Sequence, residues 1–291
     1  MIWLIGMKGM LGTEVARLFE TQGLAYRGTD REVDITREES LAAFAREAGG
    51  FSWIVNCAAY TAVDKAEEDE RTCEGINRDG AANIAQTAAR LGAKLIHIST
   101  DYVFNGQGSR PYREDDEPSP LGVYGRTKQA GETAILERHE AAYIIRTAWL
   151  YGAYGTNFVT TMLRLMGERD RVQVVQDQRG SPTWAYDLAA LILRLIGLGD
   201  AGTGVPYGIY HFSHQGDISW FDFAQAIYQE ARDLGLLSRS CVITPCTSAE
   251  FPAKVTRPAY SVLDKSKIQA ALGIQVPAWQ GALRAFLATL D

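Results

Sequence analysis

Tyr124, Lys128 and Thr100 carry side chains that can hold or transfer a proton. Tyr124 precedes Lys128 by four residues in YGRTKQAGE (124–132), whose composition favours a helix. Residues four apart project from one helix face, so the phenol and the ammonium lie one turn apart. Such pairs also arise by chance on solvated helix faces. The pair gains meaning only if neighbouring segments build a site around it.

These three side chains suit the reduction of a ketone. A phenol can donate a proton to the ketone oxygen while hydride reaches the carbon. Its pKa lies near ~10, and a cation within ~4–6 Å lowers such a pKa by ~1–3 units, so we expect Lys128 to acidify Tyr124. The Thr100 hydroxyl, at the end of the apolar run KLIHIST, would orient the carbonyl. A side-chain turn at a strand end is the alternative for Thr100.

A glycine-rich turn near the N-terminus indicates where a hydride donor would bind. Gly6, Gly9 and Gly12 form GxxGxxG between the apolar run IWLIG and a helix-like stretch. Glycines permit a tight turn, and the N–H groups at the following helix N-terminus attract a pyrophosphate. We therefore predict a dinucleotide site here, the alternative being an ordinary strand-to-helix turn.

The next segment would complete that site at the adenosine end. Asp30 follows an apparent strand (24–29), near the position of an acidic residue that binds the ribose 2′-OH. Arg31 could instead bind a 2′-phosphate, which leaves NADPH and NADH both open. Asp34 either caps the helix that begins near Thr36 or contacts adenine together with Ile35.

Small and polar residues follow two later apolar runs. Ala58, Ala59 and Tyr60 would leave room for the nicotinamide-ribose half of a dinucleotide, and a close helix–sheet contact is the alternative. Asp101 would stand at the same edge of the sheet. The acidic residues of segment 64–70 have the spacing of a solvated face, and we expect no metal site there.

The elements that must position these groups alternate between strands and helices. Apolar, β-branched runs predict buried strands, and the stretches between them predict helices. The predicted strands are 2–6, 24–29, 53–59, 94–100 and 142–152, and the predicted helices 11–23, 37–50, 71–92 and 125–139. This order predicts an α/β fold with a Rossmann-like, doubly wound parallel sheet. Ligands of such sheets bind at the carboxyl ends of the strands, which is where the groups above lie.

After about residue 150 the pattern loosens. Amphipathic helices are predicted at 157–170, 183–199, 219–235 and 279–291, with short strands at 172–176 and 208–213. We predict a NAD(P)-binding Rossmann domain over 1–150 and a smaller α+β substrate-binding region over 151–291. The helix at about 183–198 is expected to return to the first domain.

The composition argues against several classes of protein. The 291 residues are 46% hydrophobic and 22% charged, which suits a globular protein with a core. A net charge of −6 without a Lys/Arg-rich run argues against nucleic-acid binding. The four cysteines form no CxxC motif, as expected for reduced thiols in the cytoplasm. No uncharged apolar stretch reaches the ~18 residues of a membrane span, and no signal peptide is expected.

Longer motifs carry a family resemblance. The glycine turn, STDYVF (99–104) and YGRTK (124–128) resemble the extended short-chain dehydrogenase/reductases. Five more narrow it to the dTDP-4-dehydrorhamnose reductases within that family: NCAAYTAVDKAE (56–67), RTAWLYG (146–152), NFVTTMLRL (157–165), DQRGSPT (177–183) and RPAYSVLD (257–264). The resemblance implies reduction of the C4 ketone of dTDP-4-dehydro-L-rhamnose with NADPH or NADH, the last step of dTDP-L-rhamnose synthesis.

The resemblance also implies roles by position. Gly9, Met10 and Leu11 would meet the pyrophosphate, Asp30, Asp34 and Ile35 the adenosine, and Ala59, Tyr60 and Thr61 the nicotinamide half. Tyr124 would be the proton donor, and Lys128 would also hold ribose hydroxyls. Thr100, Asp101 and Trp149 would contact the sugar, and Asn157 and Arg257 the nucleotide diphosphate. For Trp149 the alternative is core packing.

Some members of the family pair through Mg²⁺ held by glutamates. Glu14 matches one such position, but Tyr186 stands where another glutamate would be expected, and the last predicted helix has no Glu. We therefore expect no bridging metal, and a monomer or a metal-free homodimer. Two other functions stay open: another nucleotide-sugar 4-ketoreductase, and a non-catalytic dinucleotide-binding regulatory subunit, which would need the glycine turn but not the tyrosine and lysine.

Overall fold

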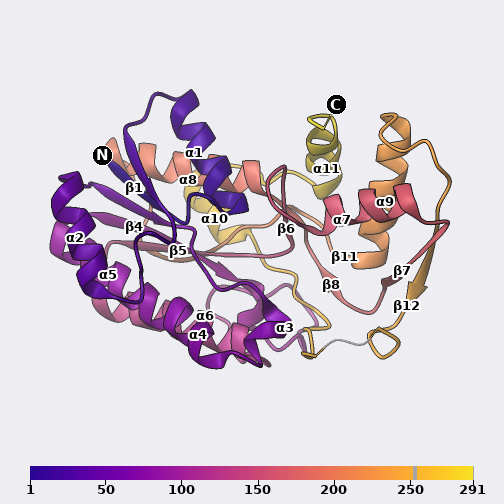
Figure 1. Ribbon diagram of the computed structural model, residues 1–291, viewed down its shortest axis with the longest axis horizontal. Helices are drawn as coiled ribbons and strands as arrows, with labels where there is room; N and C mark the ends of the chain where they lie inside the picture. Colours follow the sequence, from indigo (N-terminus) through magenta and orange to yellow (C-terminus); the bar gives the residue numbers. More distant parts are fainter. Residues whose placement is uncertain (252–253, 291) are drawn as a thin grey trace.

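A six-stranded parallel sheet forms the centre of the computed structural model, which describes residues 1–251 and 254–290. Its order is β10-β5-β4-β3-β1-β2, and Figure 1 labels β1, β4 and β5 within it. The strands are β1 (Ile2–Ile5), β2 (Tyr26–Thr29), β3 (Trp53–Asn56), β4 (Lys94–Thr100), β5 (Ala142–Thr147) and β10 (Gly208–His211). Because β1 lies between β2 and β3, the winding direction reverses at β1. Such a switch point opens a crevice at the carboxyl ends of the strands.

Helices cover both faces of this sheet, which is why its strands are apolar almost throughout. Successive residues point to opposite faces, so Leu4 and Val55 belong to one core while Trp3 and Ile54 belong to the other. The first core includes residues of α1 (Met10–Thr21), α8 (Ala185–Asp200) and α10 (Ser266–Leu272), and the second residues of α2 (Glu38–Ala48), α5 (Ala81–Leu91) and α6 (Val123–Arg138) (Figure 1). The predicted doubly wound α/β fold is confirmed.

Two predicted elements of the first half are interrupted. The strand predicted at 142–152 ends at Thr147 and resumes as β6 (Leu150–Tyr151), because Trp149 between them has φ 48°, outside the extended region. The helix predicted at 71–92 consists of α4 (Glu70–Glu74), a π-helical turn η1 (Gly75–Gly80) and α5. A π-turn shifts the direction in which the helix presents its side chains, and such turns often accompany functional sites.

A second, smaller core follows residue 150. Buried side chains such as Met166, Phe223 and Phe286 join its helices to a short parallel pair of strands. The elements are α7 (Phe158–Glu168), β7 (Arg171–Val175), α9 (Trp220–Asp233), β12 (Val242–Cys246) and α11 (Trp279–Leu287) (Figure 1). Shorter pairs are β8 (Arg179–Gly180) with β11 (Ile218–Ser219) and β6 with β9 (Thr183–Trp184). In the part of the chain that the structure describes, no helix is long and apolar enough to cross a membrane.

The predicted placement of segment 208–213 in the smaller region is wrong. β10 pairs in parallel with β5 and so completes the central sheet. The helix α8 returns to this sheet as expected, packing against α1, and α10 joins the same core. The chain therefore passes between the two regions more often than a single boundary at residue 150 implies, because β10 finds its place through pairing with a strand about 60 residues earlier.

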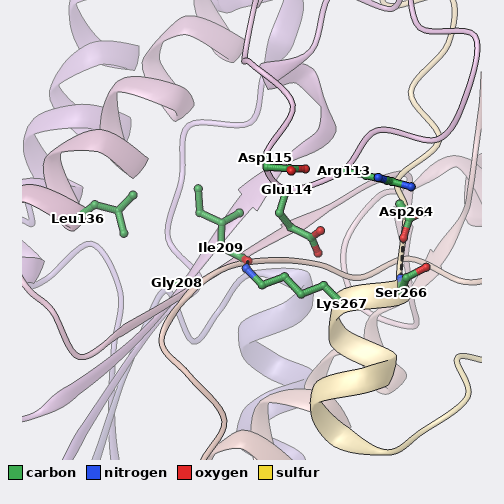
Figure 2. Close-up of a pocket in the computed structure, with 9 residues that line it drawn as sticks. All are labelled: Arg113, Glu114, Asp115, Leu136, Gly208, Ile209, Asp264, Ser266 and Lys267. Carbon is green, nitrogen blue, oxygen red and sulfur yellow. Dashed lines mark hydrogen bonds between the residues drawn. The ribbon is translucent and has the colours of Figure 1, made fainter.

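Two side chains form hydrogen bonds with the backbone of the edge strand β10. Glu114 Oε1 accepts from His211 N at 2.9 Å, and Lys267 Nζ donates to Ile209 O at 2.6 Å. Both line a cavity of about 590 Å³, which Figure 2 shows beside β10. Free backbone groups on a sheet edge invite pairing with another strand, so these contacts protect the edge. No predicted site residue lines this cavity.

Candidate active site

The largest predicted set of residues comes together in one cleft at the carboxyl ends of β1, β2 and β3. Its volume is about 1070 Å³. Its lining includes ten predicted residues, namely Gly6, Gly9, Asp30, Arg31, Asp34, Ile35, Ala58, Ala59, Tyr60 and Thr61. Met10, Leu11 and Gly12 form the first turn of α1 beside it. The size and the glycine turn of this cleft fit an extended dinucleotide.

The glycine turn is set by close backbone contacts. Gly6 has φ +78°, and a Cβ there would come within 2.7 Å of Ala58 N. A Cβ on Gly12 would collide with the Gly6 carbonyl oxygen. Gly9 is the N-cap residue of α1 and has extended backbone. The start of α1 therefore lies against the glycine turn that lines the cleft, and the free N–H groups of a helix start suit a pyrophosphate.

Local hydrogen bonds fix the predicted adenosine end. Asp30 Oδ2 accepts from Lys8 N at 3.0 Å, and its Oδ1 accepts from Arg31 N at 2.9 Å. Asp34 Oδ1 accepts from Thr36 N at 2.9 Å in a turn before α2, while the N-cap residue of α2 is Arg37. The predicted cap by Asp34 is therefore a turn that precedes the helix.

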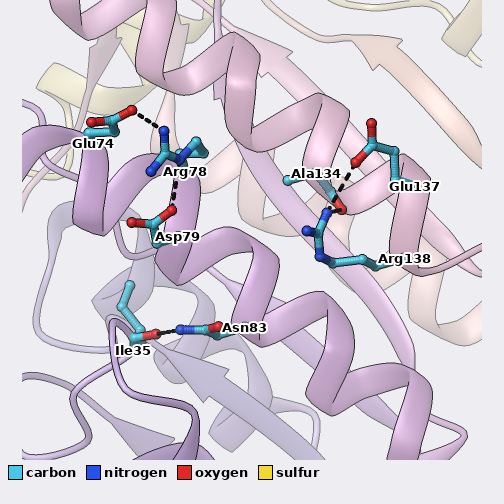
Figure 3. A network of polar contacts seen from close by, with 8 residues as sticks. All are labelled: Ile35, Glu74, Arg78, Asp79, Asn83, Ala134, Glu137 and Arg138. Atoms are coloured by element: carbon cyan, nitrogen blue, oxygen red, sulfur yellow. Dashed lines mark hydrogen bonds and ion pairs between the residues drawn. The ribbon is translucent and has the colours of Figure 1, made fainter.

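The segment around Ile35 is anchored to the helix layer. Asn83 Nδ2 donates to Ile35 O at 3.0 Å, and Figure 3 shows this contact beside the ion pairs that Arg78 makes with Glu74 and Asp79. A Cβ on Gly80 would meet the Ile35 side chain at 2.8 Å, so the glycine lets this segment approach the helix closely. The cleft wall at Ile35 is thus held by α5 and η1.

Asn77 is a site residue that the sequence analysis missed. It is buried in η1, where Oδ1 accepts from Tyr60 N at 2.9 Å and Nδ2 donates to Tyr60 O at 3.1 Å. The same Nδ2 lies 3.2 Å from Thr127 Oγ1 on α6. One amide thus clamps the backbone of the predicted nicotinamide loop to two helices. An asparagine between Gly75 and Gly80 is only a weak signal of such a role in the sequence.

Thr100 and Asp101 lie where β4 ends and a short 3₁₀ turn, η2 (Asp101–Val103), begins. Thr100 Oγ1 donates to Asp101 Oδ1 at 3.1 Å and accepts from Tyr102 N at 3.2 Å, so the side-chain turn considered as the alternative is present. Burial raises the pKa of Asp101 to about 6, and hydrogen bonds from Ser261 and Thr100 oppose that rise. The site thus contains a carboxyl group that titrates close to neutrality.

Helix α6 brings Tyr124 and Lys128 to this edge. Two glycines let α6 approach its neighbours, because a Cβ on Gly125 would collide with Tyr102 O and one on Gly131 with Asn77 O. The Tyr124 ring meets the Tyr102 ring edge-on at 5.5 Å. Thr100, at the end of β4, lies beside Tyr124. The structure therefore brings the three predicted catalytic side chains to one edge of the sheet.

The predicted acidification of Tyr124 by Lys128 is wrong in this structure. Burial raises the pKa of the Tyr124 phenol, and the Thr100 contact offsets only part of the rise. Lys128 is 1% exposed, and burial lowers its pKa to about 8. Its Nζ donates to Ile98 O at 2.6 Å and lies 3.1 Å from His97 Nε2. Desolvation is the main cause of the raised pKa of Tyr124, and for Lys128 it outweighs the opposing charge of Glu132.

The predicted sugar end lies between the two regions. Trp149 stacks on Trp220 with ring centroids 3.5 Å apart, and Gly180 leaves room for the indole, which a Cβ there would approach to 2.5 Å. Trp149 packs against the smaller core, so the packing alternative applies, and its positive φ is a strained backbone at the predicted site. The structure thus gives Trp149 a fixed orientation.

Asn157 and Arg257 already have partners in the protein. Asn157 caps α7, since Oδ1 accepts from Thr160 N at 3.1 Å, and Nδ2 donates to Gly152 O at 2.7 Å. Arg257 donates through one NH₂ group to Asp64 Oδ2 at 3.1 Å. Its Nε is buried without a partner among the described residues. The helix cap accounts for Asn157, whereas Arg257 keeps a donor for another group.

The family resemblance matched Glu14 to a metal-binding position of some members, and in this structure Glu14 forms an ion pair. Glu14 is 4% exposed, and its Oε1 accepts from Arg17 Nε at 3.0 Å. The Arg17 guanidinium lies 5.5 Å from the centre of the Tyr186 ring. Among residues 1–251 and 254–290, no cluster of three or more His, Cys, Asp or Glu side chains is arranged to hold a metal ion.

Comparison with known proteins agrees with this geometry. The family described as "RmlD substrate binding domain" matches residues 1–291. The chain is 43% identical over 284 residues to the dTDP-4-dehydrorhamnose reductase of Streptomyces griseus, which covers 97% of this chain and 91% of the relative. It is 41% identical over 292 residues to a probable dTDP-4,6-dihydroxy-2-methyloxan-3-one 4-ketoreductase of Streptomyces antibioticus, over 98% of this chain and 94% of the relative.

A solved structure is similar along the whole chain. The crystal structure of dTDP-4-dehydrorhamnose reductase from Bacillus anthracis str. Ames in complex with NADP shares 37% sequence identity and has a TM-score of 0.91. The match covers 99% of this chain and 98% of that chain. This chain is therefore a member of the dTDP-4-dehydrorhamnose reductase family of oxidoreductases.

Proposed function

We propose that the protein reduces the C4 ketone of dTDP-4-dehydro-L-rhamnose to the hydroxyl of dTDP-L-rhamnose. The observation that carries this proposal is the meeting of Thr100, Tyr124 and Lys128 at the carboxyl edge of the sheet, next to the dinucleotide-sized cleft. Relatives named for this reaction share about 40% of the sequence. A solved relative is described in complex with NADP.

The cleft residues would hold NADPH or NADH, which supplies the hydride. The glycine turn would receive the pyrophosphate, and Asp30 and Arg31 the adenosine ribose with or without its phosphate. Asn77 would keep the Tyr60 backbone in place against the nicotinamide half. Both coenzymes remain in the proposal because Asp30 and Arg31 stand side by side.

Tyr124 would donate the proton. The phenol keeps its proton at neutral pH, as a tyrosine ordinarily does, and would transfer it to the ketone oxygen as hydride reaches the carbon. The Thr100 hydroxyl would orient that oxygen. Lys128, with a pKa of about 8, is mostly charged at neutral pH and would hold the ribose hydroxyls. The sugar would lie against Trp149, whose indole suits the C–H face of a deoxysugar.

A second nucleotide-sugar ketoreduction is the alternative function. The similarity to a probable dTDP-4,6-dihydroxy-2-methyloxan-3-one 4-ketoreductase favours it, because that relative matches nearly as well as the dTDP-4-dehydrorhamnose reductases. A regulatory subunit without catalysis would not need the tyrosine, lysine and threonine to meet, so their arrangement argues against it.

The direct test is turnover by the purified protein. We expect loss of absorbance at the reduced-nicotinamide band when dTDP-4-dehydro-L-rhamnose is added with NADPH or NADH. The matched control is the UDP-linked ketosugar, which should react more slowly. Absence of turnover with both coenzymes would contradict the proposal, and faster reduction of the UDP-linked sugar would favour another ketoreductase.

A further inference from the structure

A line of hydrogen-bonding groups runs from the backbone just after β3 to Lys128, and its three side chains are buried. Ala58 N donates to Asn56 Oδ1 at 3.0 Å, and Asn56 Nδ2 lies 2.9 Å from His97 Nδ1. On the far side of the ring, His97 Nε2 lies 3.1 Å from Lys128 Nζ, which donates to Ile98 O at 2.6 Å. Asn56, His97 and Lys128 are at most 2% exposed. Bulk water therefore cannot replace a missing partner of these three side chains, and each of their donors must face an acceptor.

The direction of these hydrogen bonds is fixed at one end. A backbone N–H can only donate, so Asn56 must turn its Oδ1 toward Ala58 and its Nδ2 toward His97. His97 Nδ1 then accepts, and the single proton of a neutral ring lies on Nε2. An Nε2–H group donates, so Lys128 Nζ must accept. Only an uncharged amine has the lone pair to do so.

We infer that His97 is a positioning residue that holds Lys128 as an uncharged amine, through a hydrogen bond from Nε2–H to Nζ whose direction is set by Asn56 and Ala58 N–H. The other arrangements each bring donors together. A flipped Asn56 amide points Nδ2 at Ala58 N–H, and an imidazolium points a proton at both Asn56 Nδ2 and the lysine. A lysine ammonium facing Nε2–H does the same.

The charged and titratable groups around Lys128 are consistent with this state. Cys57, Cys73 and Glu132 face it, and burial still lowers its pKa to about 8. Glu132 does not hold Lys128 as an ammonium, because Arg146 donates to both carboxylate oxygens, through Nε at 2.9 Å and NH2 at 2.7 Å. Burial also lowers the pKa of His97, which disfavours the imidazolium.

The consequence for turnover rests on the proposed function. Below about pH 8 Lys128 gains a proton, and the ammonium can keep Ile98 O but must give up His97 Nε2–H. The charge that would bind ribose hydroxyls thus appears only when Lys128 leaves His97. The tautomer of His97 and the charge of Lys128 in the free protein do not depend on which sugar is reduced.

The test is the tautomer of His97 in the full chain. The chain has four histidines, so ¹⁵N-histidine labelling gives a small spectrum, and His97→Phe identifies the signal. Two histidines serve as internal references: His139 Nε2 lies 2.8 Å from Ala93 O and must carry its proton there, whereas His211 Nδ1 lies 3.1 Å from Tyr112 O and must carry its own on Nδ1. At about pH 9, where an amine with a pKa of about 8 is mostly uncharged, we expect His97 to match His139.

A single substitution should reverse the direction of the hydrogen bonds that His97 makes with residue 56 and with Lys128. The carboxylate of Asn56→Asp can accept from Ala58 N–H and from Nδ1–H at once, so His97 should change to the Nδ1–H form and match His211. The His139 and His211 signals should keep their tautomers. A proton on Nδ1 of His97 in the unchanged protein would overturn the inference, and so would an unchanged tautomer in folded Asn56→Asp. If that variant does not fold, the spectrum of the unchanged protein decides alone.

Failure of this inference and failure of the proposed function are distinguishable. The tautomer is measured without sugar or coenzyme, so an Nε2–H ring in a protein that reduces no ketosugar contradicts only the proposed function. Turnover of the ketosugar by a protein whose His97 carries its proton on Nδ1 contradicts only the inference.

Discussion

At the scale of single residues, Tyr124 is the group that would supply the proton. Its phenol is neutral at physiological pH, although the pKa that burial raises makes it a weaker acid than an ordinary tyrosine. The Tyr124→Phe variant keeps the ring against Tyr102 but loses the proton. We expect reduction to fall about 10²–10⁴-fold, the usual contribution of a general acid, with coenzyme affinity unchanged.

Steady-state turnover and a fluorescence titration with reduced coenzyme measure these two quantities. The matched control is Tyr102→Phe, because this neighbouring ring lies 5.5 Å away and also carries a buried hydroxyl. It should retain most of the activity. Equal losses in the two variants would show that ring packing, rather than proton donation, explains the effect.

Lys128 should make stability depend on pH. Its pKa lies at about 8 in the folded chain against 10.5 ordinarily. Between these values the unfolded chain binds a proton that the folded chain does not, so the free energy of unfolding rises with pH over this window. The rise is at most about 3 kcal/mol, from 1.36 kcal/mol for each unit of pKa shift.

Urea unfolding of the unchanged protein and of Lys128→Met over about pH 8–10.5 isolates this effect, because other titrating groups are common to both. The free energy of unfolding of the unchanged protein should gain on that of the variant as the pH rises. Parallel curves would mean that Lys128 keeps its ordinary pKa and is not desolvated.

At the scale of elements, the π-helical turn η1 is what points Asn77 at the nicotinamide loop. Asn77→Ala leaves Tyr60 N and O without their side-chain partner. An unsatisfied buried group costs about 1–3 kcal/mol, so coenzyme affinity should fall about 10–100-fold if the loop loosens. Isothermal titration with NADPH measures it. Gln86→Ala on α5 is the control, and a loss of the same size there would contradict the role of the clamp.

Elements that depend on local pattern were predictable from the sequence. The buried strands are apolar because helices cover both faces, and the glycine turn is local to a few residues, so both could be recognised without knowing the fold. The break at Trp149 could not, because it comes from a positive φ fixed by tertiary packing. The π-turn could not be predicted from the sequence either, because the composition of the helix that it interrupts gives no sign of it. Segment 242–246 alternates little, and as β12 it is stabilised by pairing with β7.

The parts of the site that were missed share one physical reason. Asn56, Asn77 and His97 act through partners that lie 17–41 positions away in the chain. Nothing in local composition distinguishes a buried asparagine that clamps a loop from one in a turn. The direction of the Tyr124 pKa shift was wrong for the same reason, since the helix spacing placed Lys128 one turn away but did not show that burial would raise the pKa of the phenol.

At the scale of the whole molecule, assembly should not depend on a metal. Glu14, the one carboxylate that matches a metal-binding position of the family, is paired with Arg17 and nearly buried. A metal ion that bound Glu14 would have to break this ion pair, and the ion itself would also lose its hydrating water. Treatment with EDTA should therefore leave the mass in analytical ultracentrifugation and the turnover rate unchanged. A fall in mass that Mg²⁺ restores would show that a bridging site forms between copies.

The C-terminal segment that begins at Lys254 ties the two halves of the chain together over the α3 (Val63–Ala66) corner. Arg257 pairs with Asp64, and Lys254 pairs with Glu68. These contacts join positions 193 and 186 residues apart. Arg257 also keeps a buried Nε without a partner among the described residues, which a diphosphate oxygen of the substrate would satisfy.

Arg257→Ala should therefore raise the KM for the nucleotide sugar about 10–100-fold, since a hydrogen bond to a charged group contributes about 1.5–3 kcal/mol, while coenzyme affinity stays the same. Lys254→Ala is the matched control: it removes an exposed ion pair of the same segment, which solvent screens, and should change KM little. Asp64→Ala separates the two roles of the arginine. If Arg257 acts only by fastening the segment, Asp64→Ala should raise KM as much as Arg257→Ala does, and the assignment to the diphosphate would be wrong.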